Sequence, residues 1–148
     1  SDLLELKSSL RWDVRSKRVN RDLERTITKS VAGFMNHRGG NLVIGIDDDG
    51  RTIGIDADLR TLKHKNTDGF ERALMDLISV TLGTDACSLA HCRFRQLDGV
   101  AVCHVVIERS NKPVYVRDAG SERYFVRTGN STRELDAREA HAHISRRG

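Results

Sequence analysis

The dipeptide Asp98-Gly99 lies between two segments in which apolar and polar residues alternate. Both central residues of a type I′ β-hairpin turn adopt positive φ, so an Asp-Gly pair is one of the strongest local predictors of a hairpin. The register that this turn sets places Cys103 opposite Phe94 and His104 opposite Arg93. The chain is therefore expected to contain an antiparallel pair of strands that every other element has to accommodate.

The remaining sequence predicts further strands and three helices. Leu23, Ile27 and Val31 recur at helical spacing after the expected N-cap Asn20, and this helix should end at Gly39-Gly40. The other expected elements are strands at 3–7, 41–46, 51–55, 112–116 and 123–128, a helix at 68–81 capped by Asp68, and a helix that begins with a capping box at Asp136. We therefore predict an α+β fold, with a single compact domain over residues 1–148 that has a mixed, mostly antiparallel β-sheet and about three packed α-helices.

Three consecutive aspartates, 47–49, follow an apolar strand and precede Gly50. If Asp49-Gly50 form a two-residue turn, Asp48 faces Arg51. Asp and Gly are favoured in turns because their backbones tolerate positive φ. Carboxylates are also the ligands that Mg²⁺ prefers. The residues alone leave both a turn and a metal site open.

Positive charge is unevenly distributed along the chain, whose formal net charge is +4. Cations gather at 11–29 and again at 109–133, on either side of an acidic block at 47–58. Two such stretches on a small domain favour a polyanionic partner. Aromatic residues make up only 5% of the chain, which favours contacts with a phosphate backbone over stacking on bases.

Several classes of protein are not supported by the sequence. No apolar run has the length needed to cross a membrane, and no signal-peptide pattern opens the chain. Three irregularly spaced cysteines predict a reducing, cytoplasmic setting, and the absence of C-x₂-C and H-x₃-H pairs makes structural zinc unexpected. The chain has no Walker-type phosphate loop, so ATP binding by this domain is not predicted.

Four separated segments occur in the order LLELKSS, VAGFMNHRGGNLVIGIDDDGRTIGI, KPVYV and YFVRTGNSTREL. Together they resemble the Schlafen AlbA-type domain family over nearly the whole chain. The resemblance implies an α+β fold and binding of DNA or RNA. It also implies that the domain is part of a larger protein, such as a transcriptional regulator or a defence-type protein.

The family includes metal-dependent endoribonucleases that cut structured RNA such as tRNA. By the motif, the resemblance implies catalytic roles for Glu5, Lys7 and Asp48, with Glu5 and Asp48 as ligands of Mg²⁺ or Mn²⁺. A further glutamate of the pattern would lie on the N-terminal side of Ser1. An endoribonuclease is therefore the alternative function, whereas nucleic-acid binding by itself requires no cofactor.

The prediction for the interface is a set of polar and cationic residues that contact mainly phosphates. Its members are Arg11, Arg15, Lys17, Arg18, Arg38, Lys112, Arg117, Arg127, Asn130 and Arg133. The expected partner is nucleic acid rather than a membrane, with a homodimer or contacts to other domains of the parent protein as further possibilities. A third alternative is an oligomerising scaffold domain, which would need no arginines directed at phosphate.

Overall fold

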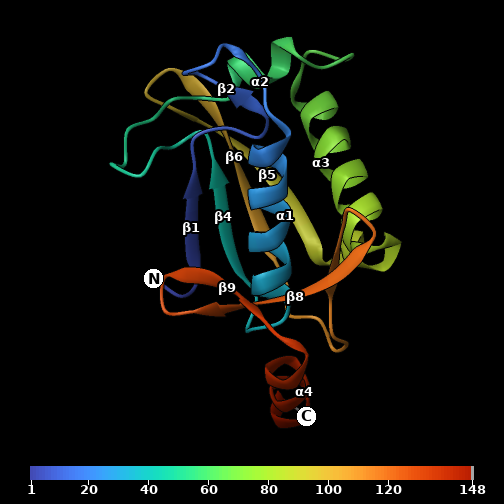
Figure 1. Ribbon diagram of the computed structural model, residues 1–148. Helices are drawn as coiled ribbons and strands as arrows, with labels where there is room; N and C mark the ends of the chain where they lie inside the picture. Colours follow the sequence, from blue (N-terminus) through green and yellow to red (C-terminus); the bar gives the residue numbers. More distant parts are fainter. Residues whose placement is uncertain (148) are drawn as a thin grey trace.

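A four-stranded sheet carries most of the core in the computed structural model, which describes residues 1–147 (Figure 1). Its strands are β1 (Leu4–Lys7), β4 (Gly40–Ile44), β5 (Ala90–Leu97) and β6 (Val100–Ile107), in the order β1-β4-β6-β5. β1 runs parallel to β4, whereas the other two pairs are antiparallel. The predicted α+β class and the mixed, mostly antiparallel character are confirmed.

The hairpin of β5 and β6 has the register predicted from Asp98-Gly99. These two residues have φ values of 51° and 81°, as a type I′ turn requires. Cys103 lies opposite Phe94, and His104 lies opposite Arg93. The prediction is confirmed because the register of a two-residue turn depends only on local chemistry.

The described strands outside this sheet form two smaller sheets rather than extending the large one. β2 (Trp12–Asp13) and β3 (Arg18–Val19) make a two-stranded ribbon. β7 (Tyr115–Asp118), β8 (Ser121–Thr128) and β9 (Ser131–Leu135) form a sheet in that order. β9 was not among the predicted strands, and it pairs with β8 through a two-residue turn at Gly129-Asn130.

The strand predicted at 112–116 begins only at Tyr115, because the side chain of Asn36 forms hydrogen bonds with the backbone of Val114, the residue before it. The Asn36 amide donates to the carbonyl oxygens of Val114 (2.8 Å) and Phe125 (2.9 Å), and its Oδ1 accepts from the Val114 nitrogen (2.8 Å). Asn36 is buried at the end of a helix. A single side chain therefore connects that helix to the residue before β7 and to β8.

The described helices are α1 (Arg21–Met35), α2 (Asp56–Arg60), α3 (Thr67–Leu82) and α4 (Ala137–Arg147), with a 3₁₀ helix at Thr84–Leu89. None of them is both long enough and apolar enough to span a membrane. The three longest correspond to the three predicted helices.

Side chains cap the first turns of the three long helices. Asn20 caps α1 as predicted, and Asp136 and Glu139 form the predicted capping box of α4, with hydrogen bonds of 2.8 and 3.1 Å. The cap predicted for α3 is wrong. Asn66, rather than Asp68, accepts the hydrogen bond from the first turn, because the helix begins at Thr67, two residues before the start that an Asp68 cap implies.

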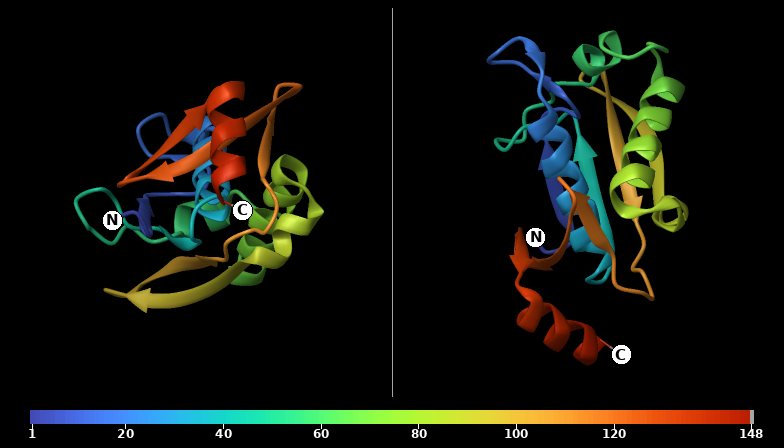
Figure 2. Two further views of the ribbon diagram at one scale, coloured as in Figure 1. Left: turned by 90° about the horizontal axis from the view of Figure 1, so that it is seen from below. Right: turned by 45° about the vertical axis from the view of Figure 1, so that its right-hand side comes forward.

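Helix α1 lies at the centre of the fold. It packs on the four-stranded sheet through Phe34 and on the three-stranded sheet through its opposite side, as the left view of Figure 2 shows. The approach to β4 is close, since a Cβ on Gly40 would lie 2.3 Å from the Phe34 ring. The chain turns between them at Gly39, whose φ of +75° favours glycine.

Asp58 is a buried carboxylate that orders the start of the ribbon. It is 1% exposed, and its oxygens accept hydrogen bonds from the backbone nitrogens of Leu10 (2.8 Å), Arg11 (3.0 Å) and Trp12 (2.8 Å). Leu10 and Arg11 belong to the connection between β1 and β2, and Trp12 begins β2. Asp58 therefore holds the segment between β1 and β2 against α2.

Replacing Asp58 should show this dependence directly. Asp58→Ala should lower the free energy of unfolding by about 2–4 kcal/mol, because three backbone donors lose their acceptor. Asp56→Ala, on the exposed side of the same helix, should change it by no more than about 0.5 kcal/mol. Urea unfolding followed by circular dichroism measures both, and equal effects would contradict the structural role of Asp58.

Candidate functional site

A pocket of about 250 Å³ opens beside β1, at the edge of the four-stranded sheet. Glu5 and Lys7 lie on the same face of the sheet as Leu42 and Ile44 of β4, so they point toward the helix layer. The pocket is lined by Glu5, Lys7, Thr26, Lys29, Ser30, Phe125, Asn130, Ser131 and Thr132. It therefore joins β1, α1 and the turn between β8 and β9.

Two lysines bring positive charge to this pocket. Lys7 Nζ lies 3.5 Å from Glu5 Oε2. Lys29 Nζ lies 5.6 Å from the centre of the Phe125 ring, within the range of a cation–π contact. The pocket thus combines two ammonium groups with one carboxylate and several hydroxyl groups.

Arg127 lies beneath the pocket and not on the surface. It is 3% exposed, donates to the carbonyl oxygens of Ser1 (3.0 Å) and Leu4 (2.9 Å), and forms an ion pair with Glu5. Its guanidinium also lies 4.8 Å from the centre of the Phe34 ring. The expectation that Arg127 contacts phosphate does not agree with this burial, because its donors already face the protein interior.

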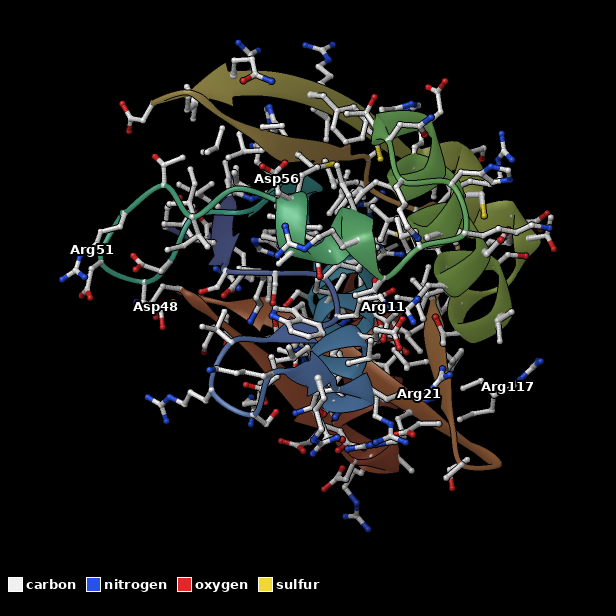
Figure 3. The ribbon with its side chains drawn as sticks, turned by 90° about the horizontal axis from the view of Figure 1, so that it is seen from above. Arg11, Arg21, Asp48, Arg51, Asp56 and Arg117 are labelled. Atoms are coloured by element: carbon white, nitrogen blue, oxygen red, sulfur yellow. The ribbon has the colours of Figure 1, made fainter. Side chains whose placement is uncertain are left out.

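The predicted metal ligands are not arranged as a metal site. Glu5 is engaged by both Arg127 and Lys7, and the cations compete with a metal ion for its oxygens. Asp48 lies on the projecting loop between β4 and α2, as Figure 3 shows. Along the chain it is six residues beyond Leu42, the residue of β4 that pairs with Glu5. Within residues 1–147 no group of three or more His, Cys, Asp or Glu side chains could hold an ion. The residues present do not fit a Mg²⁺ or Mn²⁺ site.

Asp47, rather than Asp48, forms the hydrogen bonds that order the acidic turn. Its backbone carbonyl accepts from Gly50 (3.0 Å), and its Oδ1 accepts from the nitrogens of Asp49 (3.0 Å) and Arg51 (2.9 Å). The Asp47 nitrogen also donates to the Arg51 carbonyl, so Asp47 faces Arg51. The predicted pairing of Asp48 with Arg51 is therefore wrong, because the turn contains one residue more than a two-residue hairpin.

The prediction of a strand at 51–55, after this turn, is also wrong. A single bridge from Ile46 to Thr52 replaces it. Ile53 and Gly54 donate instead to one carbonyl, that of Gly45, so a continuous ladder does not form. The acidic segment is thus an ordered, exposed loop.

Two substitutions separate the turn from any other role of these acids. Asp47→Ala should lower the free energy of unfolding by about 1 kcal/mol, because two backbone donors lose their acceptor. Asp48→Ala should change it by no more than about 0.5 kcal/mol, since the Asp48 side chain is exposed. Thermal unfolding measures both, and a larger loss for Asp48→Ala would show that Asp48 is a turn residue.

The second basic stretch is largely neutralised by neighbouring acids. Lys112 lies 3.6 Å from Asp85, Arg117 lies 3.4 Å from Glu122, and Arg133 lies 3.5 Å from Glu139. These three pairs are solvent-exposed, and such pairs are weak individually. They nevertheless place a negative charge beside each cation that was predicted to contact phosphate.

Arg123 shows the same neutralisation in a stronger form. Its guanidinium donates to both carboxylate oxygens of Glu134, at 2.9 and 2.7 Å, and also pairs with Asp118. The hydrogen bonds from Arg123 hold the pKa of Glu134 below its usual range. Arg38 from the predicted set is likewise paired, with Asp2 at 2.5 Å.

The first basic stretch differs, because its cations on the ribbon have no acidic partner among residues 1–147. Arg15, Lys17 and Arg18 are exposed on the connection between β2 and β3 and at the start of β3. The connection is ordered by Asp13, whose Oδ1 accepts from the Arg15 nitrogen (3.0 Å). A hydrogen bond from Asn20 to the same carboxylate lowers the Asp13 pKa. Three free cations are therefore displayed on a defined turn.

The sequence analysis missed two features of this site. Lys29 and Ser30 line the pocket but were not predicted as site residues, since helical spacing alone does not show which neighbour an outward side chain faces. Of the remaining predicted residues, Asn130 lies at the exposed tip of the β8–β9 turn, and Arg11 is half-buried beside the Asp58 carboxylate that accepts from its backbone.

Comparisons with known proteins were made for the whole chain. The family model described as Schlafen, AlbA_2 matches residues 1–136. No curated protein matches the sequence.

Two solved structures are similar in fold. The DIP2311 protein from Corynebacterium diphtheriae has a TM-score of 0.65 and 20% identity, and the match covers 91% of this chain but only 22% of that protein. The N-terminal domain of a RecG-related protein from Nitrosomonas europaea, named for an ATP-dependent DNA helicase, has a TM-score of 0.57 and 19% identity. That match covers 90% of this chain and 84% of the other.

Proposed function

Because the chain belongs to the Schlafen AlbA_2 family, we propose that it is a nucleic-acid-binding domain that contacts mainly the phosphate backbone. The family is associated with nucleic acid, and the name of the RecG-related relative refers to a DNA helicase. The proposal adds two points to this association. It says which surface of this chain makes the contacts, and it says that these contacts are mainly with phosphate.

The observation that carries the proposal is the exposed, unpaired state of Arg15, Lys17 and Arg18. Neutralising phosphates with lysine and arginine releases condensed counterions, which drives binding without regard to sequence. A cation that already pairs with a carboxylate releases fewer counterions, so the second basic stretch is the weaker candidate. The ribbon also leads directly into α1, whose Lys29 faces the pocket.

Reversing the ribbon charges should weaken binding and reduce its salt dependence. The variant Arg15→Glu, Lys17→Glu, Arg18→Glu should flatten the plot of log affinity against log salt by about one unit for each lost phosphate contact. Fluorescence anisotropy with a labelled duplex at several salt concentrations measures the slope.

A matched control separates local contacts from total charge. Arg60, Lys63 and Arg72 are also exposed, on or between α2 and α3, and their reversal to glutamate changes the net charge equally. This control should retain most of the slope. If both variants flatten the slope equally, binding depends on net charge and the ribbon is not the interface.

We also propose that the domain works as one part of a larger regulatory or defence-type protein in the cytoplasm. The support is that the matched region makes up 22% of the DIP2311 protein. A homodimer, or contacts with companion domains, fits the same arrangement.

A metal-dependent endoribonuclease is the second candidate, because Glu5 and Lys7 lie together in one pocket. We expect binding without cleavage, since Glu5 is held by two cations and Asp48 lies on another loop. Incubating labelled tRNA with the protein and excess Mn²⁺ should leave the RNA intact. Cleavage that EDTA stops and that Glu5→Ala or Asp48→Ala abolishes would make the endoribonuclease the better assignment.

A further inference from the structure

The four-stranded sheet has two edge strands, and they differ in length and in how far their backbone is already bonded. β1 has four residues, and its Leu4 carbonyl accepts a hydrogen bond from Arg127. β5 has eight residues, all of which pair with β6 in one register without a bulge. No strand within residues 1–147 pairs with the other side of β5. The sheet therefore has one long, regular edge that is open.

The register of the hairpin determines which backbone groups lie on this open edge. The residues that flank a two-residue turn, here Leu97 and Val100, exchange both of their backbone hydrogen bonds, and such pairs alternate with pairs that exchange none. Cys92, Phe94 and Gln96 belong to the second kind, so their N–H and C=O groups point away from β6. None of these groups makes a backbone hydrogen bond elsewhere in residues 1–147. β5 thus presents three donors and three acceptors at the spacing of a strand.

Two arginines lie on the outer face of β5. The Phe94 ring is on the helix side, 5.9 Å from the centre of the Phe70 ring, so its neighbours Arg93 and Arg95 point to the opposite face. The left view of Figure 2 shows the described helices on one side of this hairpin, and both arginines are exposed. The ion pair that β5 makes within residues 1–147 joins His91 to a different strand end, so neither arginine has an acidic partner there.

His104 of β6 is affected by the same excess of positive charge. It lies opposite Arg93 on the outer face. Burial lowers the pKa of His104, and the charges of Arg95 and Arg93 lower it further. A carboxylate that approached this face would be attracted by both arginines. The outer face beside the open edge is therefore suited to an acidic partner.

The arginines also distinguish between possible partner strands. A second copy that paired its β5 with this one about a two-fold axis would bring its own Arg93 and Arg95 to the same face of the joint sheet, where like charges on neighbouring strands are destabilising. A strand with acidic residues at alternate positions would place carboxylates there instead. Its intervening side chains would lie beside Cys92 and Phe94, which are half-buried and pack against the core, so apolar residues suit those positions.

From these observations we propose that β5 is a docking edge for an extended segment of a partner protein in which acidic residues alternate with apolar ones. The segment adds an antiparallel fifth strand to the sheet. Hydrogen bonds to the outward backbone groups of β5 supply affinity, and contacts with Arg93 and Arg95 supply selectivity. This edge is opposite the β1 edge that carries the pocket, so the proposal goes beyond nucleic-acid binding and does not depend on it.

Synthetic peptides test the proposal with the intact domain. The probe is a fluorescent eight-residue peptide in which glutamate alternates with valine, and a scrambled peptide with grouped glutamates is its control. Two further peptides carry N-methyl groups, one on the valines and the other on the glutamates. In an antiparallel ladder the residues that bond to Phe94 and its equivalents lie directly opposite them and share their face, so they are the valines. N-methylation of the valines therefore removes the donors that face β5, whereas N-methylation of the glutamates keeps them.

Fluorescence anisotropy measures the affinities at one salt concentration. The alternating peptide should bind on the order of tenfold more tightly than the scrambled one, because only the first aligns its charges with a ladder. The peptide methylated on valine should lose a similar factor, and the one methylated on glutamate should lose little. Binding should also slow amide hydrogen exchange at Cys92, Phe94 and Gln96. The amides of Arg93 and Arg95 already bond to β6 and should change little.

Variants of the domain separate charge from backbone pairing. Reversing both arginines, Arg93→Glu with Arg95→Glu, should weaken the alternating peptide on the order of tenfold. Arg138→Glu with Arg146→Glu, on exposed positions of α4, changes the net charge equally and should retain most of the affinity. Gln96→Pro removes one outward donor without a change in charge, and proline is tolerated on an open edge. It should weaken binding, whereas Gln96→Thr should not.

Three results would overturn the proposal. The first is equal affinity for the alternating and scrambled peptides, which would show that charge alone is bound. The second is unchanged hydrogen exchange at the three outward amides in the presence of saturating peptide. The third is a dimer in sedimentation experiments that Gln96→Pro converts to a monomer, which would assign the edge to a second copy of the chain. If Gln96→Pro does not fold, the two methylated peptides still decide whether a ladder forms.

Discussion

The buried guanidinium of Arg127 is the interaction on which the arrangement of the site depends. It extends from β8 in the three-stranded sheet to the Leu4 carbonyl and the Glu5 carboxylate of β1 in the four-stranded sheet, so it joins two sheets that share no ladder. It also donates to the Ser1 carbonyl, before β1. Burying an ion pair is weak evidence for stability, since its desolvation offsets much of the attraction. The Nε of Arg127 has no partner among the described residues, which adds to that cost. We therefore attribute to Arg127 the placement of Glu5 in the pocket rather than a large contribution to folding.

Local chemistry accounts for the parts of the fold that the sequence predicts well. The Asp98-Gly99 turn, the Asn20 cap and the capping box at Asp136 each depend on residues a few positions apart. Two local predictions nevertheless failed, the α3 cap and the turn at Asp47, where neighbouring residues offer the same chemistry. Other features were missed because they involve partners distant along the chain. Asn36 interrupts a strand 78 positions away, and Asp58 orders a segment 48 positions earlier. No periodicity in either segment indicates those contacts.

The predictions for the candidate site divide in the same way, between features set by local sequence and features set by distant partners. The motif placed Glu5 and Lys7 correctly on the first strand, and alternation along that strand brings them to one pocket. Counting cations along the sequence overestimated the second basic stretch, because strand pairing and the α4 cap bring acids beside them. Arg123 and Glu134, for example, are neighbours only because β9 pairs with β8. Composition counts charges, whereas only the fold decides which of them are already paired.

The ribbon and the pocket differ in how their charged side chains are held. Attraction by the exposed cations of the ribbon reaches as far as the screening length, about 8 Å at physiological salt, and does not distinguish one polynucleotide from another. Discrimination requires a group that is held rigidly and shielded from water, because an unmet acceptor is costly only where water cannot reach it. Glu5 is held in position by Arg127 and is 20% exposed, whereas Asp48 lies on an exposed loop. Helix α1 connects the two parts, since the ribbon precedes it and Lys29 and Ser30 lie on it. Substitutions in the ribbon and in the pocket therefore act at the two ends of one structural unit.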